Sequence, residues 1–368
     1  MAEIADLRHR LAAIAAGPED APRGLPGCFY TDPDWFAWEA QTMLRRGWHG
    51  VAREDEIAQA GDYLVVDLLG EPVLLVRDQD GNVRAFSNLC RHRGMPLAEG
   101  RGTAPRFVCP YHAWAYDLDG RLLRAARMKN ADFDPAKCRL PEFGAAVAHG
   151  FIYVCLQPEQ GFAADPSLDA LLAPYDPGAF RIVHQAEEIW ACNWKSLVEN
   201  FMEGYHLSVV HPQTLHGYTP TGLSQKGPDG PGFTSYFANY PAAVSRGVGA
   251  PGLDMEARQR SSLFAVFPTQ VASQAATLLV ALAIAPLAVD RIRVRWTMSA
   301  YGDELDAATL AARIGLWEEV NREDREKLER MQGALSSVHA DGGYLAGADY
   351  EGTVRDFHRW LAAEDARS

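Results

Sequence analysis

Long hydrophobic runs are missing from this chain of 368 residues. The longest apolar stretch, 275–289, is broken by Pro286 and falls short of the roughly 20 apolar residues that cross a bilayer. The first residues include acidic side chains and lack the apolar segment of a secretory signal. We therefore expect no membrane span, no membrane partner and a cytoplasmic location.

The chain also lacks any block of basic residues. It carries 48 acidic against 35 basic side chains, for a net charge of −13, which argues against nucleic acid as a partner. No G-x-G-x-x-G segment opens a helix after a strand, so we expect no flavin or nicotinamide site in this chain. Cysteine is scarce as well, and four of the six cysteines are scattered without a disulfide framework: Cys28, Cys138, Cys155 and Cys192.

The other two cysteines each stand close to a histidine. Cys90 precedes His92 by two positions, Cys109 precedes His112 by three, and sixteen residues separate the two pairs. A zinc finger would run Cys, Cys, His, His, with one like pair on each element. Here each loop offers one thiolate and one imidazole, which suits a cluster of two unlike irons at a reduction potential of about −150 mV or higher. A mononuclear zinc site and two unrelated buried pairs are the alternatives.

The residues around these pairs, 94–97 and 113–114, resemble the Rieske 2Fe-2S family. The resemblance implies a Rieske cluster held by Cys90, His92, Cys109 and His112, and therefore a centre for electron transfer.

Periodicity predicts an α+β chain with three parts. Residues 1–44 have helical patterns, 45–155 alternate as short antiparallel strands with both ligand pairs at loop tips, and 156–368 mix strands with helices. In this last part we expect a helix from 193 to about 209 and another from about 309 to 331.

A second group of ligands is predicted in the last part. His206 and His211 do not share one face of a regular helix, but Pro212 disfavours helical geometry at His211 and frees it to turn towards His206. Asp324 occupies a position where the apolar stripe of the 309–331 helix calls for an apolar side chain. Two histidines and one carboxylate form the facial triad of non-haem Fe(II) oxygenases. The alternatives are an Asp324 bonded to a local backbone or arginine partner, or a helix kinked so that Asp324 is exposed.

The run from 193 to 211, with Gln332-Gly333 after Asp324, resembles the α subunits of Rieske non-haem iron oxygenases, also called ring-hydroxylating oxygenases. The resemblance covers the chain from about Leu25 onwards. It implies an antiparallel β Rieske domain, a catalytic domain with the helix-grip fold on which 1–44 packs, and mononuclear Fe(II) held by His206, His211 and Asp324.

The same resemblance implies a homotrimer in which electrons cross between subunits. The acidic residue three before the first iron histidine is Glu203, so the implied route is cluster, His112, Glu203, His206 and iron. Aromatic-ring dioxygenases usually have Asp at this place, and Glu is similar to the carnitine and choline monooxygenase branch. A plain charge on the helix surface is the alternative for Glu203.

The function implied is that of a terminal oxygenase. Electrons from a separate NAD(P)H-dependent reductase, of flavin or ferredoxin type, would activate O2 to hydroxylate or oxidatively demethylate a small organic substrate. We favour monooxygenation, with a quaternary ammonium compound as one candidate substrate, for which an aromatic cage is expected. An arene dioxygenase α subunit is the runner-up, and a Rieske-type electron carrier is the alternative of another class. Aromatic residues that could line the pocket are Tyr205, Tyr218, Tyr236 and Phe237.

Overall fold

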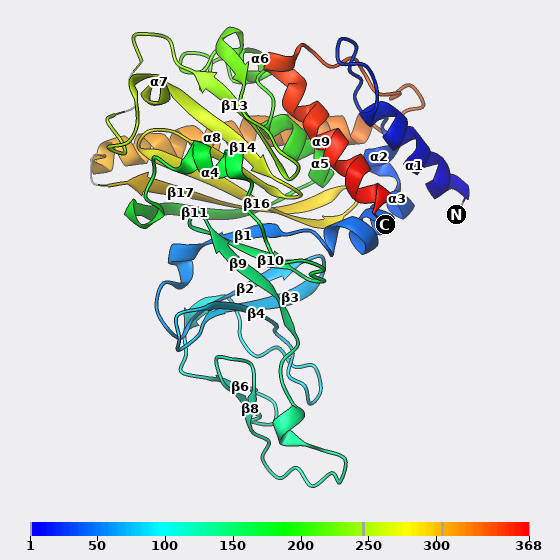
Figure 1. Cartoon of the computed structure of the whole chain (residues 1–368), viewed down its shortest axis with the longest axis vertical. Coiled ribbons are helices and arrows are strands. Elements are labelled where there is room, and N and C mark those ends of the chain that lie inside the picture. Colours follow the sequence, from blue (N-terminus) through cyan, green and yellow to red (C-terminus); the bar gives the residue numbers. More distant parts are fainter. Residues whose placement is uncertain (1, 245–246, 303–304, 368) are drawn as a thin grey trace. The chain divides into compact units, whose positions relative to one another are not determined.

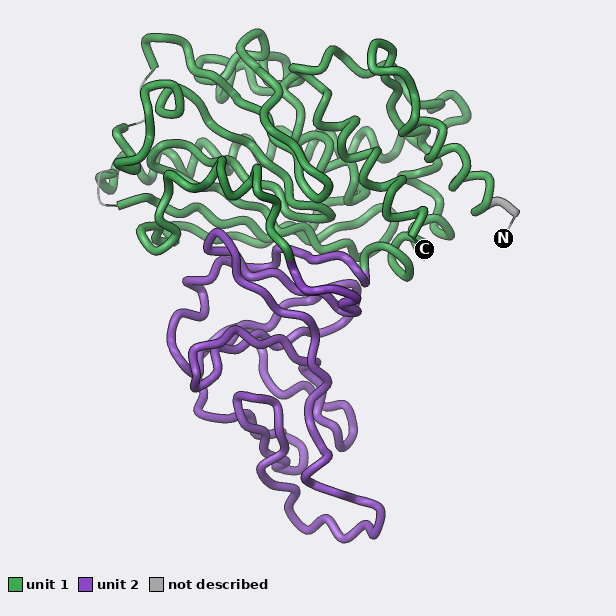
Figure 2. The backbone as a smooth tube through the Cα atoms, viewed as in Figure 1, with its two compact units in different colours: residues 1–44, 163–368 green, residues 45–162 purple. Residues whose placement is uncertain are grey.

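The computed structural model describes residues 2–244, 247–302 and 305–367. The chain forms two compact units, one of residues 45–162 and the other of residues 1–44 with 163–368 (Figure 2). The sequence pattern places the end of the first unit at 155. The unit extends further because Phe162 stacks on Tyr153, with ring centroids 4.2 Å apart, and meets Trp48 edge-on.

The unit of residues 45–162 is built from antiparallel strands. Its larger sheet has the order β1-β10-β9-β4-β3-β2-β5, and a three-stranded sheet has the order β6-β7-β8. The strands are β1 His49–Arg53, β2 Asp62–Leu68, β3 Glu71–Arg77, β4 Val83–Ser87, β5 Arg101–Thr103, β6 Phe107–Val108, β7 Ala115–Tyr116, β8 Leu122–Arg124, β9 Glu142–Ala148 and β10 Phe151–Cys155. Alternate residues of β3 pack into two separate cores, as the two-residue period of a strand requires.

The other unit is a seven-stranded antiparallel sheet with helices. The sheet order is β11-β17-β16-β15-β14-β13-β12, with β11 Phe180–Trp190, β12 Ser224–Lys226, β13 Phe233–Asn239, β14 Arg260–Val266, β15 Gln270–Gln274, β16 Leu278–Ala288 and β17 Arg291–Tyr301. Strand β17 alternates arginine with Ile292, Val294 and Trp296, and those three side chains are buried. The expectation of an antiparallel β unit followed by a unit of antiparallel sheet with helices is confirmed.

The helices of this unit are α1 Ala2–Ala15, α2 Cys28–Thr31, α3 Pro33–Glu39, α4 Pro166–Leu172, α5 Trp194–Phe201, α6 Leu207–Val210, α7 Met255–Arg258, α8 Ala307–Ala334 and α9 Ala348–Ala366. Helix α5 contacts β15 and β16 and lies between α8 and α9 (Figure 1). Asn193 caps the start of α5 by accepting from the N–H of Lys195, and Asp306 caps α8 by accepting from that of Thr309. A π-helical turn, Ala40–Leu44, follows α3.

The N-terminal segment is tied to the rest of its unit by charged side chains. Arg8 on α1 pairs with Asp365 on α9 at 3.0 Å. Glu39 on α3 pairs with Lys195 on α5 at 2.7 Å, and both side chains are buried. The indole N–H of Trp194 also donates to Glu39. Removing one partner of such a buried pair typically costs about 3–5 kcal/mol, so the segment is an integral part of the unit.

Among the described residues, no helix is both long and apolar enough to cross a membrane.

Candidate active site

Two loops of the 45–162 unit hold the first ligand group, and they repeat one backbone design. In the first, the N–H of Cys90 donates to the carbonyl of Met95 and that of Gly94 donates to the carbonyl of Cys90. In the second, the N–H of Cys109 donates to the carbonyl of Trp114, and that of Ala113 donates to the carbonyl of Cys109. Gly94 and Ala113 both have positive φ, of 71° and 57°. Each loop is therefore a tight knuckle that presents a Cys and a His from the same side.

The four side chains divide into a buried pair and a surface pair. Cys90 and Cys109 are 3% and 2% exposed, whereas His112 is exposed and its Nδ1 atom lies 3.1 Å from that of His92. The Tyr116 hydroxyl lies 3.4 Å from the Cys90 sulfur. Burial raises the pKa of the Cys90 thiol, and the neighbouring Cys109 adds to the rise. Two adjacent thiols inside and two facing imidazole nitrogens outside match the donor set of a Rieske cluster.

The second ligand group depends on a break in the expected 193–209 helix. Helix α5 ends at Phe201 and α6 begins at Leu207. Between them the N–H of Gly204 donates to the carbonyl of Tyr350, while the N–H groups of Tyr205 and His206 donate to the Glu203 carboxylate. These bonds replace the helical ones. The prediction of one continuous helix was therefore wrong. The Glu203 carboxylate and the carbonyl of Tyr350 compete with the helical carbonyls for these N–H groups.

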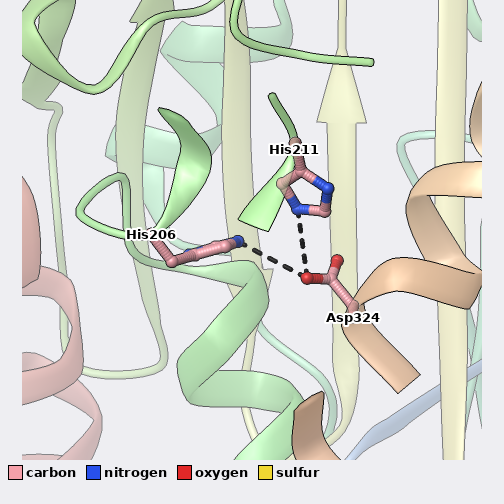
Figure 3. Close-up of side chains that lie close together, drawn as sticks. All are labelled: His206, His211 and Asp324. Atoms are coloured by element: carbon pink, nitrogen blue, oxygen red, sulfur yellow. Dashed lines mark ion pairs between the residues drawn. The ribbon is translucent and has the colours of Figure 1, made fainter. Parts of the chain in front are cut away.

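The break places His206 and His211 at the two ends of α6, and both rings point at Asp324 (Figure 3). The Nε2 atoms of His206 and His211 lie 3.5 and 3.1 Å from Oδ1 of Asp324. The ligand atoms of all three residues lie within 4.8 Å of one another. Asp324 lies on the buried face of α8 and is 8% exposed.

Each histidine is held from behind by a carboxylate. Nδ1 of His206 is hydrogen-bonded to Glu203, and Nδ1 of His211 lies 2.7 Å from Oε2 of Glu323. Burial disfavours the charged form of His206, but the hydrogen bond and the negative charge of Glu203 outweigh burial and raise its pKa. Thr214 donates a second hydrogen bond, of 2.7 Å, to Glu323. Both rings are thereby fixed with Nε2 facing Asp324.

This arrangement fits a metal ion. Because Glu203 and Glu323 accept the Nδ1–H protons, the Nε2 atoms present lone pairs to a carboxylate oxygen that also carries lone pairs. His211 Nε2 is buried and accepts no hydrogen bond from any residue that the structure describes, although it lies 3.1 Å from Oδ1 of Asp324. A buried acceptor left unsatisfied costs about 1–3 kcal/mol, and a cation between the three groups removes that cost. Two imidazoles with one carboxylate match the facial triad of non-haem iron.

A cavity of about 660 Å³, its open mouth included, lies beside this group. It is lined by Leu207, which follows His206, and by Trp317, which is two helical turns before Asp324 on α8. Tyr236 also lines it. Burial raises the pKa of Tyr236 well above its usual value, and the charges of Glu203 and Asp324 add to the rise. The cavity therefore adjoins the triad of His206, His211 and Asp324.

Of the four aromatic residues expected in the pocket, the structure places Tyr236 in the wall of this cavity. Phe237 is the next residue on β13, so it points to the other face of the sheet, where Arg260 lies 3.6 Å from its ring centroid. Tyr205 and Tyr218 are 58% and 37% exposed and do not belong to the wall described here.

Sequence reasoning missed three residues of this region. Glu323 gave no signal, because an acid beside Asp324 on a charged helix has the pattern of a surface residue. Asn200 lies at the end of α5, with its amide nitrogen 3.3 Å from Oδ1 of Asp324. Arg313 lines the cavity, and its spacing of eleven residues from Asp324, three helical turns, was a usable signal for a shared face.

Comparison with known proteins gives matches over both units. Residues 47–143 match the Rieske 2Fe-2S domain, and residues 174–364 match the catalytic domain of the ring hydroxylating alpha subunit. A glycine betaine monooxygenase oxygenase subunit of Chromohalobacter salexigens is 37% identical over 195 residues, which are 52% of this chain and 44% of that protein. A carnitine monooxygenase oxygenase subunit of Escherichia coli K12 is 36% identical over 205 residues, 54% of each chain. The chain matches about half the length of these relatives.

Solved structures share the fold over nearly the whole chain. The quaternary ammonium Rieske monooxygenase CntA with L-carnitine has a TM-score of 0.81 and 22% identity, over 96% of this chain and 98% of that one. Naphthalene 1,2-dioxygenase from Rhodococcus sp. has a TM-score of 0.83 and 19% identity, over 98% of both. The resemblance seen in the motifs is confirmed: the chain belongs to the ring-hydroxylating α subunit family, with a Rieske domain followed by the catalytic domain.

Proposed function

We propose that this chain is a terminal oxygenase component. Cys90, His92, Cys109 and His112 would hold a Rieske 2Fe-2S cluster, and His206, His211 and Asp324 would hold a ferrous ion. The reaction is monooxygenation: a substrate C–H bond, O2, two electrons and two protons give C–OH and water. The observation that carries the proposal is the convergence of three electron-pair donors, from His206, His211 and Asp324, within 4.8 Å of one another.

The electrons must come from another protein. The sequence has no dinucleotide-binding motif, so we infer a separate NAD(P)H-dependent reductase that delivers electrons to the cluster. His92 and His112 form the accessible side of the cluster site, which suits exchange of electrons with a neighbouring protein.

Iron at the triad would supply open coordination positions for reductive activation of O2. The protein's own groups prepare the site. Glu203 and Glu323 fix the two imidazole rings and keep the protons on Nδ1, so that Nε2 is free to bind. In a ring of subunits, Glu203 would also join His206 to His112 of the next subunit. We therefore infer a homotrimer. We also infer that it works in the cytoplasm.

The substrate class follows from the relatives and the cavity. The relatives of known activity are named for glycine betaine and carnitine, and another for choline. Tyr236 and Trp317 bring aromatic side chains to the cavity wall, and such rings attract a quaternary ammonium group. Hydroxylation of an N-methyl group would give an N-hydroxymethyl compound, which releases formaldehyde and leaves the demethylated amine.

Iron analysis and a single-turnover assay test this function. The loaded protein should contain about three irons per chain, two in the cluster and one at the triad. The protein would be reduced, mixed with O2 and with ammonium compounds or aromatic acids, and the products identified by mass spectrometry with formaldehyde measured in parallel. A single-oxygen or demethylated product is expected. Two irons and no product would indicate an electron carrier, and a cis-diol would indicate an arene dioxygenase; either result would contradict the proposal.

A further inference from the structure

A single cationic side chain lies in the wall of the cavity described above. Arg313 on α8 is half-buried, lines the cavity, and has no hydrogen bond or ion pair with any described residue. Two other arginines of the helix differ, because Arg322 pairs with Glu319 and Glu326 and Arg325 pairs with Glu188 and Glu329. Arg313 is thus a cation that faces the cavity without a counter-charge.

The residues around Arg313 do not neutralise it. No acidic side chain belongs to the described wall of the cavity, whose polar groups are hydroxyls such as those of Tyr240 and Ser261, 2.6 Å apart. Burial raises the pKa of Tyr240 to about 12, while the hydrogen bond to Ser261 and the charge of Arg313 act in the opposite direction. Burying part of an unpaired guanidinium in a mostly apolar wall costs free energy. An anion bound beside Arg313 would lower this cost.

Arg313 lies nearer the start of α8 than Asp324 does. Eleven helical residues separate it from Asp324, which is about 16 Å along the axis and returns to nearly the same face. Trp317 lies between them on this face, and Tyr236 lies near the charges of Glu203 and Asp324. The wall therefore carries aromatic rings, of which Tyr236 lies near negative charge, and a positive charge at Arg313.

We propose that Arg313 binds the carboxylate of the substrate, and that the preferred substrates are zwitterions with a quaternary ammonium group at one end and a carboxylate at the other. This inference rests on the proposed oxygenase function and narrows its substrate class. The planar guanidinium forms two parallel hydrogen bonds to a carboxylate, a geometry that neither an alcohol nor lysine reproduces. The ammonium group is then directed towards Tyr236 and Trp317, the aromatic side chains of the same wall. Arg313 acts as a specificity residue.

Binding and turnover of matched compounds test this assignment. Glycine betaine and choline share a trimethylammonium group, and they differ in having a carboxylate or a hydroxymethyl group. Titration calorimetry would measure the binding of each compound to the wild type, Arg313→Gln and Arg313→Lys. The control is Arg330→Gln, which alters an exposed arginine of the same helix. Because a hydrogen-bonded charge contributes about 1.5–3 kcal/mol, Arg313→Gln should weaken glycine betaine binding about 10- to 100-fold.

Choline binding should change by less than about twofold in Arg313→Gln, since choline makes no bidentate pair. Arg313→Lys should recover part of the affinity for glycine betaine, and Arg330→Gln should match the wild type. Equal loss for both compounds, or a wild type that prefers choline, would overturn the assignment. Loss of benzoate binding in Arg313→Gln, with no ammonium compound bound by the wild type, would overturn the zwitterion class.

Turnover is measured separately, so the two proposals fail in different ways. A wild type that binds glycine betaine through Arg313 and forms no oxygenated or demethylated product would contradict the oxygenase function and support the carboxylate site. Product formation that is unaffected by Arg313→Gln, with unchanged affinity, would support the oxygenase function and overturn the carboxylate site.

Discussion

At the scale of single residues, Glu203 and Glu323 decide how the imidazole rings of His206 and His211 point. His206, His211 and Asp324 were predictable, because Pro212 and the interrupted apolar stripe of α8 each leave a mark in the sequence. Of the two acids that support the histidines, Glu203 was predicted from the sequence and Glu323 was not. Glu203 was expected as a link between subunits, and the structure adds its hydrogen bond to His206 Nδ1 within the chain. Glu323 reaches His211 from a distant element and leaves no local pattern.

Replacing Glu203 should lower turnover without lowering the iron content. Glu203→Ala removes the acceptor of His206 Nδ1 and the proposed link to the neighbouring cluster, but it leaves the side chains of His206, His211 and Asp324 unchanged. We expect both metal contents to stay near the wild-type values and turnover to fall by about 100-fold or more. Iron analysis, the absorbance of the cluster and the rate at which O2 reoxidises the reduced cluster in the presence of substrate would measure this.

The matched control is Glu326→Gln, which changes an exposed acid of α8 and should leave turnover unchanged. Glu203→Gln keeps the size of the side chain, and its reoxidation rate should fall as much as that of Glu203→Ala. Normal reoxidation in Glu203→Ala would show that the residue is a surface charge. Loss of triad iron with an otherwise normal rate per iron would limit its role to positioning His206.

At the scale of elements, the break between α5 and α6 forms the site. Helical periodicity ran through 193–209 because Met202, Tyr205 and Val209 keep spacings of three and four residues across the break. The competing acceptors, Glu203 and the carbonyl of Tyr350, are not visible in a propensity argument, since Tyr350 is almost 150 positions away. Local patterns predict elements, and long-range acceptors decide where those elements end.

Gly204→Ala should therefore damage the iron site through the backbone. A Cβ at position 204 would lie 2.1 Å from Oγ and 2.7 Å from Cβ of Ser224, which begins β12, so the 203–206 segment must move. Such overpacking typically costs about 1–3 kcal/mol of unfolding free energy. Thermal unfolding should show the loss, and iron content at the triad should fall while the cluster absorbance remains.

Gly217→Ala provides the control for this change. Gly217 is exposed in the same region of the chain, and a Cβ there would meet nothing within 4 Å. Its stability should equal or slightly exceed that of the wild type, because alanine restricts the unfolded chain. If both variants retained iron equally, the close approach of Gly204 to Ser224 would not control the geometry of His206.

At the scale of the whole molecule, the sequence placed two metal groups in two separate units, and it predicted the sheets better than the links between elements. The two Cys and His loops, the Asp-Gly turns and the alternation of β17 are local features, so they were visible. The pairing of Glu39 with Lys195 was not, because both residues look like ordinary surface charges until the fold buries them. The cavity wall combines residues from four strands and several helices and loops. The place of Arg313 in this wall is therefore seen only in the folded unit.

Mixed oligomers would show whether electrons cross between subunits. Asp324→Ala should keep the cluster and lose triad iron, and His112→Ala should lose a functional cluster and keep triad iron. The two variants would be co-expressed with different tags, and oligomers carrying both tags purified. In a head-to-tail ring of three, each mixed ring has one junction that joins an intact cluster to an intact triad, so about a third of wild-type turnover is expected. Each variant alone should be inactive. Mixed oligomers without turnover would show that transfer occurs within one chain, and a monomer in solution would contradict the ring.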